Sequence, residues 1–111
     1  MARILVLVLS GPEATFRVAS GLGFAAVAHD QGAEVRVIFF ADGVRVPLEA
    51  DHYPELKKRL SALSERGILP AVCRRNLEAL GRPTELPGFD VHYIGQDLVR
   101  ASEEGFAVLS F

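Results

Sequence analysis

The chain has 111 residues, a formal net charge of −2, and 50% hydrophobic against 23% charged residues. This length fits one domain, residues 1–111, and the high apolar content excludes a disordered chain. Because acidic and basic residues are interspersed, no basic surface for nucleic acid or an anionic membrane is visible, and we expect neither as a partner.

Cysteine and histidine usage excludes two further classes. The only cysteine is Cys73, so an intrachain disulfide framework is impossible, and three scattered histidines argue against a metal site. The apolar run after Met1 is too short for a secretory signal and lacks a small-residue cleavage pattern. No uncharged run approaches the ~20 residues of a membrane span. We therefore expect a cytoplasmic protein.

The first half of the chain predicts two strands around a long helix. Residues 4–9 form a continuous apolar run, which is typical of a parallel strand covered on both faces. The Ser-x-x-Glu spacing of residues 10–13 predicts a helix from residue 12 or 13 to residue 31, ended by Gly32. Residues 34–40 predict a second strand, and residues 41–53 a long irregular loop.

The second half continues the alternation. It predicts helices over residues 54–66, from residue 73 or 74 to 80, and over residues 97–104, and strands over residues 68–72, 90–94 and 106–111. Pro70 conflicts with a central strand, because proline removes one ladder hydrogen bond. Strands that alternate with helices along the whole chain predict an α/β fold, a three-layer α/β/α sandwich around a mostly parallel sheet.

The predicted first helix is apolar on almost all sides. Between Arg17 and Asp30 it carries no formal charge, and small residues alternate with larger apolar ones. Such a helix needs cover on more than its sheet-facing side. A subunit contact explains this pattern, and so does a helix whose small residues let it pack closely on the sheet.

Cys73 is the sharpest candidate for chemistry. A thiol between a strand end and a helix start lies near unpaired backbone N–H groups, and Arg74 and Arg75 follow it. Both features favour the thiolate, which is the nucleophilic form. A lone cysteine at the end of a buried strand is, however, also typical of a small hydrophobic core residue.

Other candidates follow the remaining predicted strands, where ligands bind in parallel sheets. Asp42 is either a substrate-facing carboxylate or part of an Asp-Gly turn. Glu13 either faces the same crevice, caps the first helix, or pairs with Arg17. His52 either exchanges protons with a neighbouring thiol or is a surface histidine, and His92 is expected to be structural or exposed. No dinucleotide, phosphate-loop, dithiol or serine-hydrolase motif is present, so we expect no cofactor.

The order of several segments resembles a known family. An apolar strand followed by Ser10-Gly11-Pro12-Glu13 precedes a small-residue helix, and then come Phe39-Phe40-Ala41-Asp42-Gly43-Val44, Cys73 with Gly81 eight positions on, and the terminal Val108-Leu109-Ser110-Phe111. This order resembles the DsrE/DsrF-like family of small sulfur-relay proteins, including its TusD-like and YchN-like members. The resemblance covers nearly the whole chain.

The resemblance implies a five-stranded sheet between helices, assembly into homotrimers or homohexamers, and a cysteine matching Cys73 near a subunit contact. It also implies a sulfur carrier or sulfurtransferase-like activity, in which Cys73 accepts sulfane sulfur as a persulfide from a donor protein and passes it to an acceptor. Arg74 would stabilise the thiolate, with Asp42 and His52 nearby. The alternative is a non-catalytic oligomeric binding or assembly module with the same fold, so whether the protein is an enzyme stays open.

Overall fold

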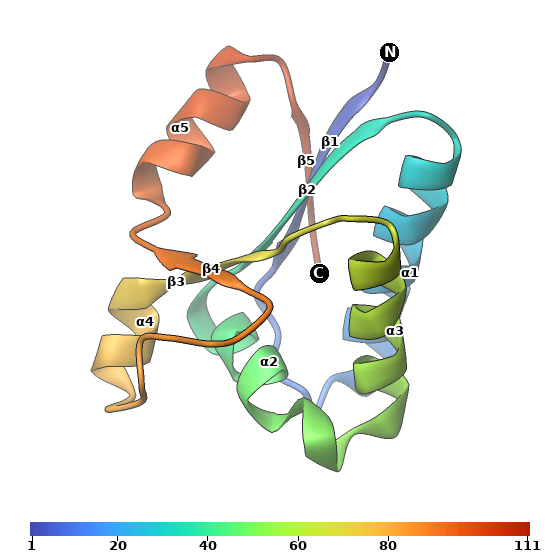
Figure 1. The fold of residues 1–111 in the computed structure, drawn as a ribbon. Coiled ribbons are helices and arrows are strands. Elements are labelled where there is room, and N and C mark those ends of the chain that lie inside the picture. Colours follow the sequence, from blue (N-terminus) through green and yellow to red (C-terminus); the bar gives the residue numbers. More distant parts are fainter.

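The computed structural model describes residues 1–111 and contains one parallel five-stranded sheet in the order β4-β3-β2-β1-β5 (Figure 1). The strands are β1 (Arg3–Val8), β2 (Glu34–Phe39), β3 (Ala71–Cys73), β4 (Asp90–His92) and β5 (Ala107–Ser110). The longer helices are α1 (Thr15–Asp30), α3 (Pro54–Glu65) and α5 (Gly95–Glu103). The shorter ones are η1 (Ala41–Val44), α2 (Arg45–Glu49), η2 (Ala50–His52) and α4 (Arg74–Ala79).

Chain topology explains how the helices are distributed over the two faces. The chain moves from β1 through β2 and β3 to β4 in one direction, and then crosses back to β5 beside β1. Because such crossovers are right-handed, the forward connections place α1 and α3 on one face and the return connection places α5 on the other. Figure 1 shows this arrangement. The predicted α/β sandwich is therefore confirmed.

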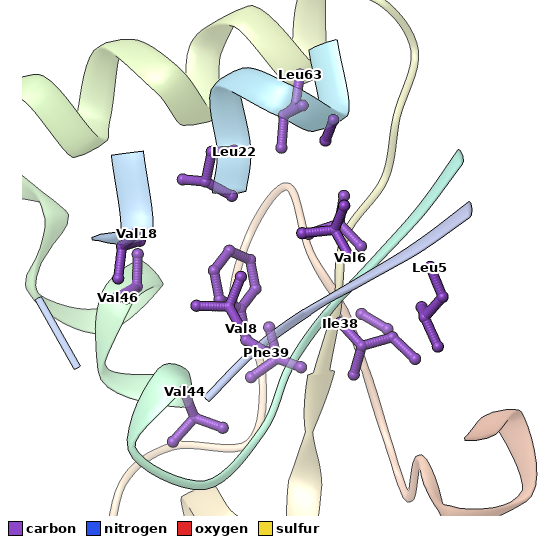
Figure 2. Close-up of a cluster of buried hydrophobic side chains, with 14 of the residues drawn as sticks. Leu5, Val6, Val8, Val18, Leu22, Ile38, Phe39, Val44, Val46 and Leu63 are labelled. Atoms are coloured by element: carbon purple, nitrogen blue, oxygen red, sulfur yellow. The ribbon is translucent and has the colours of Figure 1, made fainter. Parts of the chain in front are cut away.

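The main core lies between the sheet and the α1–α3 layer. Val6 and Val8 of β1 are fully buried, as is Leu22 of α1. Figure 2 shows Leu22 and Leu63 above the face from which Val6 projects, while Leu5 and Ile38 lie on the opposite side of the strands. Both faces of β1 are thus covered, which explains why residues 4–9 are continuously apolar rather than alternating.

Pro70 no longer conflicts with the sheet. The predicted strand over residues 68–72 is wrong at its start, because β3 begins at Ala71 and Pro70 precedes it. The Pro70 carbonyl still accepts a hydrogen bond from the Asp90 backbone N–H at 2.9 Å. Proline can accept such a bond but cannot donate one, so its position immediately before the strand costs no ladder bond.

The predicted irregular loop over residues 41–53 is also wrong. This segment forms η1, α2 and η2 in direct succession. Its first turn lies against the end of β1, where a Cβ atom added to Gly43 would be 1.9 Å from the Val8 carbonyl oxygen. The absence of a side chain at Gly43 therefore lets the segment pack tightly beneath the sheet edge.

The ends of two helices differ from their predicted positions. Helix α1 begins at Thr15 after Ala14, without a side-chain cap, so the predicted capping role of residues 10–13 is wrong. The Thr15 hydroxyl instead donates to the Pro12 carbonyl at 2.6 Å. Helix α5 begins at Gly95, two residues earlier than predicted. None of the helices has the length and apolar character needed to cross a membrane.

Candidate functional site

Cys73 occupies the junction that the sequence predicts. It is the last residue of β3 and the residue before the first helical turn of α4, with an extended backbone conformation. The first N–H groups of a helix have no partner within the helix, so the backbone after Cys73 offers free donors. The residue is only 4% exposed and its thiol is free.

An open cleft of 630 Å³ reaches Cys73 at the carboxyl edge of the sheet. The residues that line it lie at or just after the ends of the neighbouring strands β2, β3 and β4 and in the first turns of α4 and α5; they are Phe40, Cys73, Arg75, Tyr93, Ile94, Gly95 and Gln96. Of the predicted site residues Cys73, Arg74, Asp42, Glu13 and His52, only Cys73 lines this cleft. Cys73 is thus almost fully buried but borders an open space at the sheet edge.

The two arginines after Cys73 meet at one aromatic ring. The guanidinium carbons of Arg74 and Arg75 each lie 5.6 Å from the centre of the Tyr93 ring, within the range of cation–π attraction. Arg74 also donates to Glu78 at 3.4 Å, and the Tyr93 hydroxyl donates to the same carboxylate at 2.9 Å. Arg75 is the arginine that lines the cleft, whereas Arg74 is engaged by Glu78.

A second polar cluster lies beside the cleft, at the end of β4. Nε2 of His92 lies 2.5 Å from Oδ2 of Asp97, and Nδ1 of His92 lies 3.1 Å from Oδ1 of Asp90. Burial alone would lower the pKa of His92, but the hydrogen bonds to Asp97 and Asp90 and their charges raise that pKa above its ordinary value. The geometry therefore favours the charged imidazolium.

Glu13 takes part in an ion-pair network away from the cleft. Arg45 donates to Glu13 and, at 2.8 Å, to Glu49. The hydrogen bonds from the Arg45 guanidinium hold the pKa of Glu13 below its ordinary value. Glu13 therefore neither caps α1 nor pairs with Arg17, and instead ties the β1–α1 connection to α2.

Asp42 and His52 are both exposed, and neither lines the cleft that contains Cys73. His52 ends η2, which Figure 1 shows between α2 and α3, well separated from α4. The neighbour of Asp42 has the closer link to the site, because the Ala41 backbone N–H donates to Oδ1 of Asn76 in α4 at 2.9 Å.

The sequence does not predict three features of this region. Arg75 lines the cleft, Tyr93 contacts Glu78, and His92 lies between two carboxylates. One signal was available for His92. Asp90 and His92 are two residues apart in a strand and therefore share a face. Asp97, five residues further on, lies in the first turn of the following helix. The contact between Tyr93 and Glu78 joins two separate elements, and no local pattern predicts it.

Comparisons with known proteins agree with the fold. The family model described as "DsrE/DsrF-like family" matches residues 2–111. The crystal structure of the ychN protein from E. coli superposes with a TM-score of 0.82 at 18% identity, with 100% of each chain covered. A conserved protein of unknown function from Bacteroides thetaiotaomicron, BT1422, gives a TM-score of 0.68 at 17% identity, with 98% of this chain and 94% of that chain covered.

No curated protein sequence matches the chain. Because their sequence identities are below 20%, the two solved structures show a shared fold and nothing more. The family model matches residues 2–111 and therefore shows the family. With its parallel five-stranded sheet and its strand-to-helix cysteine, the chain belongs to the DsrE/DsrF-like family, which is associated with sulfur relay.

Proposed function

We propose that the protein is a sulfur carrier that holds sulfane sulfur as a persulfide on Cys73 and passes it to a partner protein. The observation that carries this proposal is the place of the only thiol in a sulfur-relay family member. Cys73 ends β3, precedes the first turn of α4, and lines an open cleft. Cytoplasmic reducing conditions would keep this single thiol available for loading.

The chemistry needs no cofactor. The Cys73 thiolate attacks the outer sulfur of a donor persulfide, a new S–S bond forms at Cys73, and the donor's S–S bond breaks. The donor leaves as a thiolate, so electrons balance without an external oxidant. Attack of an acceptor thiolate on the outer sulfur of the Cys73 persulfide repeats the same exchange and regenerates the free thiol.

Burial of the thiol restricts what can deliver the sulfur. With Cys73 only 4% exposed, a flat protein surface cannot reach the sulfur atom, whereas a small molecule or a narrow, extended segment fits the cleft. The cleft also shields a bound persulfide, which exposed sites would lose to further oxidation. These features favour a donor that presents its sulfur on a flexible arm.

The direct test is the intact mass of the protein after incubation with a small persulfide donor. Wild-type protein should gain one sulfur atom, and Cys73→Ser should gain none. A folded, reduced wild type that alkylates at Cys73 but never gains sulfur would contradict the proposal, because the thiol would then be accessible without being a sulfur acceptor.

We further propose a homo-oligomer, a trimer or hexamer, in which α1 contributes to the contact between copies. Phe16 and Val27 on this helix are 88% and 58% exposed, and they lie eleven residues apart, about three helical turns, on one stripe. Ser20 and Gly23 lie between them on the same stripe and would let another helix approach closely. Exposed apolar residues that share one helix face are typical of an interface.

This apolar stripe also supports the second candidate function, a non-catalytic assembly module. Light scattering of wild type and Phe16→Ser separates the possibilities. An oligomer that dissociates in the variant supports the α1 contact, and a monomeric wild type contradicts it. If Cys73→Ser retains the biological activity while Phe16→Ser loses it, the assembly role rather than sulfur transfer is the function.

A further inference from the structure

The pairing of β3 with β4 places a titratable cluster directly beside Cys73. In this parallel ladder Cys73 is the register partner of His92. Paired residues of neighbouring strands lie about 4.8 Å apart, and their side chains leave the sheet on the same face. His92 is therefore the nearest neighbour of Cys73 across the sheet, although it lines the adjacent groove rather than the cleft itself.

Both ring nitrogens of His92 are held by carboxylates from two different elements. Asp90 comes from the same strand, and Asp97 comes from the first turn of α5. An imidazole that is bracketed in this way can satisfy both carboxylates only as the doubly protonated cation. The ring is consequently unable to accept the proton of Cys73, and it acts through its charge.

Most of the other charged side chains around the cluster form ion pairs. Arg36 of β2, which lines the same groove, contacts Glu34 and Glu104, and Arg66 contacts Asp30. Glu34 completes the charged lining of that groove, which also includes His29. On the cleft side, Arg74 pairs with Glu78, and Arg75 faces the Tyr93 ring. The Asp90–His92–Asp97 cluster contains the histidine that is the register partner of Cys73, so its charge changes directly beside the thiol when His92 loses its proton.

With His92 protonated, two carboxylates and one imidazolium carry a net charge of −1, and loss of the proton makes it −2. We propose that loss of the His92 proton lowers the reactivity of Cys73 towards anionic sulfur compounds relative to neutral ones. The deprotonated cluster repels an anion more strongly than the protonated cluster does, because its net charge is −2 rather than −1. His92 is then a specificity-determining residue, with Asp90 and Asp97 as its positioning residues.

This inference rests on the proposed function and deepens it, because it assigns the same thiol a pH-dependent discrimination: anionic sulfane-sulfur compounds react less readily, relative to neutral ones, as the pH rises. Its test must not depend on persulfide formation. Alkylation of Cys73 meets this requirement, since iodoacetate and iodoacetamide react with the thiolate by the same displacement and have similar size, but only iodoacetate is an anion. A change in the thiolate fraction or in access to the cleft alters both rates by the same factor, so it leaves the ratio of the two rates unchanged.

The experiment measures this ratio for wild type, His92→Gln and Asp97→Asn from pH 6 to pH 9. The wild-type iodoacetate-to-iodoacetamide ratio should fall by roughly threefold to tenfold as the pH rises, which is the effect of one unit charge about 6 Å away behind strong solvent screening. His92→Gln should show the low ratio throughout. Asp97→Asn removes one negative charge and should raise the ratio at low pH.

The control is His52→Gln, because His52 lies far from the cleft and should leave the ratio and its pH dependence unchanged. A wild-type ratio that does not vary with pH would overturn the inference, even if both cluster variants fold poorly. So would a folded His92→Gln with the wild-type profile. Either result leaves the persulfide-loading experiment unaffected, so failure of this inference is distinguishable from failure of the proposed sulfur transfer.

Discussion

Oδ1 of Asn76 accepts a hydrogen bond from the Ala41 backbone N–H at 2.9 Å, and this bond joins the helix that follows Cys73 to the turn that follows β2. Ala41 has a positive φ of 55°, which is an uncommon conformation for a residue with a side chain. The Asn76 side chain therefore helps to hold a strained residue beside Phe40, which lines the cleft.

We expect Asn76→Ala to lower the free energy of unfolding by about 1 kcal/mol, the usual value of one hydrogen bond. It should also increase the alkylation rate of Cys73, because the wall formed by Phe40 is held less firmly. Urea unfolding and alkylation kinetics check both effects. Asn76→Asp, which keeps the acceptor oxygen, should retain most of the stability, and an unchanged unfolding curve for Asn76→Ala would contradict this account.

Gly43→Ala should destabilise the fold by about 3 kcal/mol, because the new methyl group would collide with the backbone of Val8 rather than with a flexible side chain. The matched control is Gly95→Ala, since nothing lies within 4 Å of a Cβ atom at that position. Thermal unfolding of both variants tests the contact. Similar melting temperatures for the two variants would show that η1 does not pack against β1 as described.

The Glu13–Arg45 pair should make the stability of the fold depend on pH in the acid range. Arg45 holds the pKa of Glu13 below its ordinary value. The stabilisation from this pair is therefore fully present at pH values above the ordinary pKa of Glu13 and is lost as the pH falls through the lowered pKa. Glu13→Gln should therefore be less stable than wild type at pH 7, and the difference should shrink towards pH 3. Glu85→Gln, at an exposed position without an ion pair, should show no such trend.

His92 should produce the opposite dependence. Its pKa is raised in the folded protein, so its contribution to stability is fully present below the unfolded value and is lost as the pH rises through the raised pKa. The stability difference between wild type and His92→Gln should accordingly be larger at pH 5.5 than at pH 9. A difference that grows with pH would contradict the imidazolium assignment.

Much of the fold could be predicted because β1 is buried on both faces and therefore has a continuous apolar sequence. The glycines after the helices mark the alternation of helices and strands clearly. Pro54 at the first position of α3 predicts the start of that helix correctly. The errors occur where a distant contact decides the local structure, as in residues 41–53, whose helical turns depend on packing against β1.

The site was predictable to a smaller extent. A strand followed directly by a helix predicts the place of Cys73, because the local sequence alone determines this junction. The surroundings of the thiol depend instead on which strands are neighbours. His92 lies beside Cys73 only because β4 pairs with β3, and Asp42 and His52 lie outside the cleft although they follow the same edge of the sheet.

The central claim is that Cys73 carries sulfur reversibly, and intact mass through one load-and-discharge cycle tests it most directly. Reduced protein is incubated with a small persulfide donor, freed of it, and then mixed with an excess of a small thiol as acceptor. We predict a gain of one sulfur atom located on Cys73, followed by complete return to the starting mass. No gain on accessible, reduced Cys73, or a gain that the thiol cannot remove, would contradict the role of sulfur carrier.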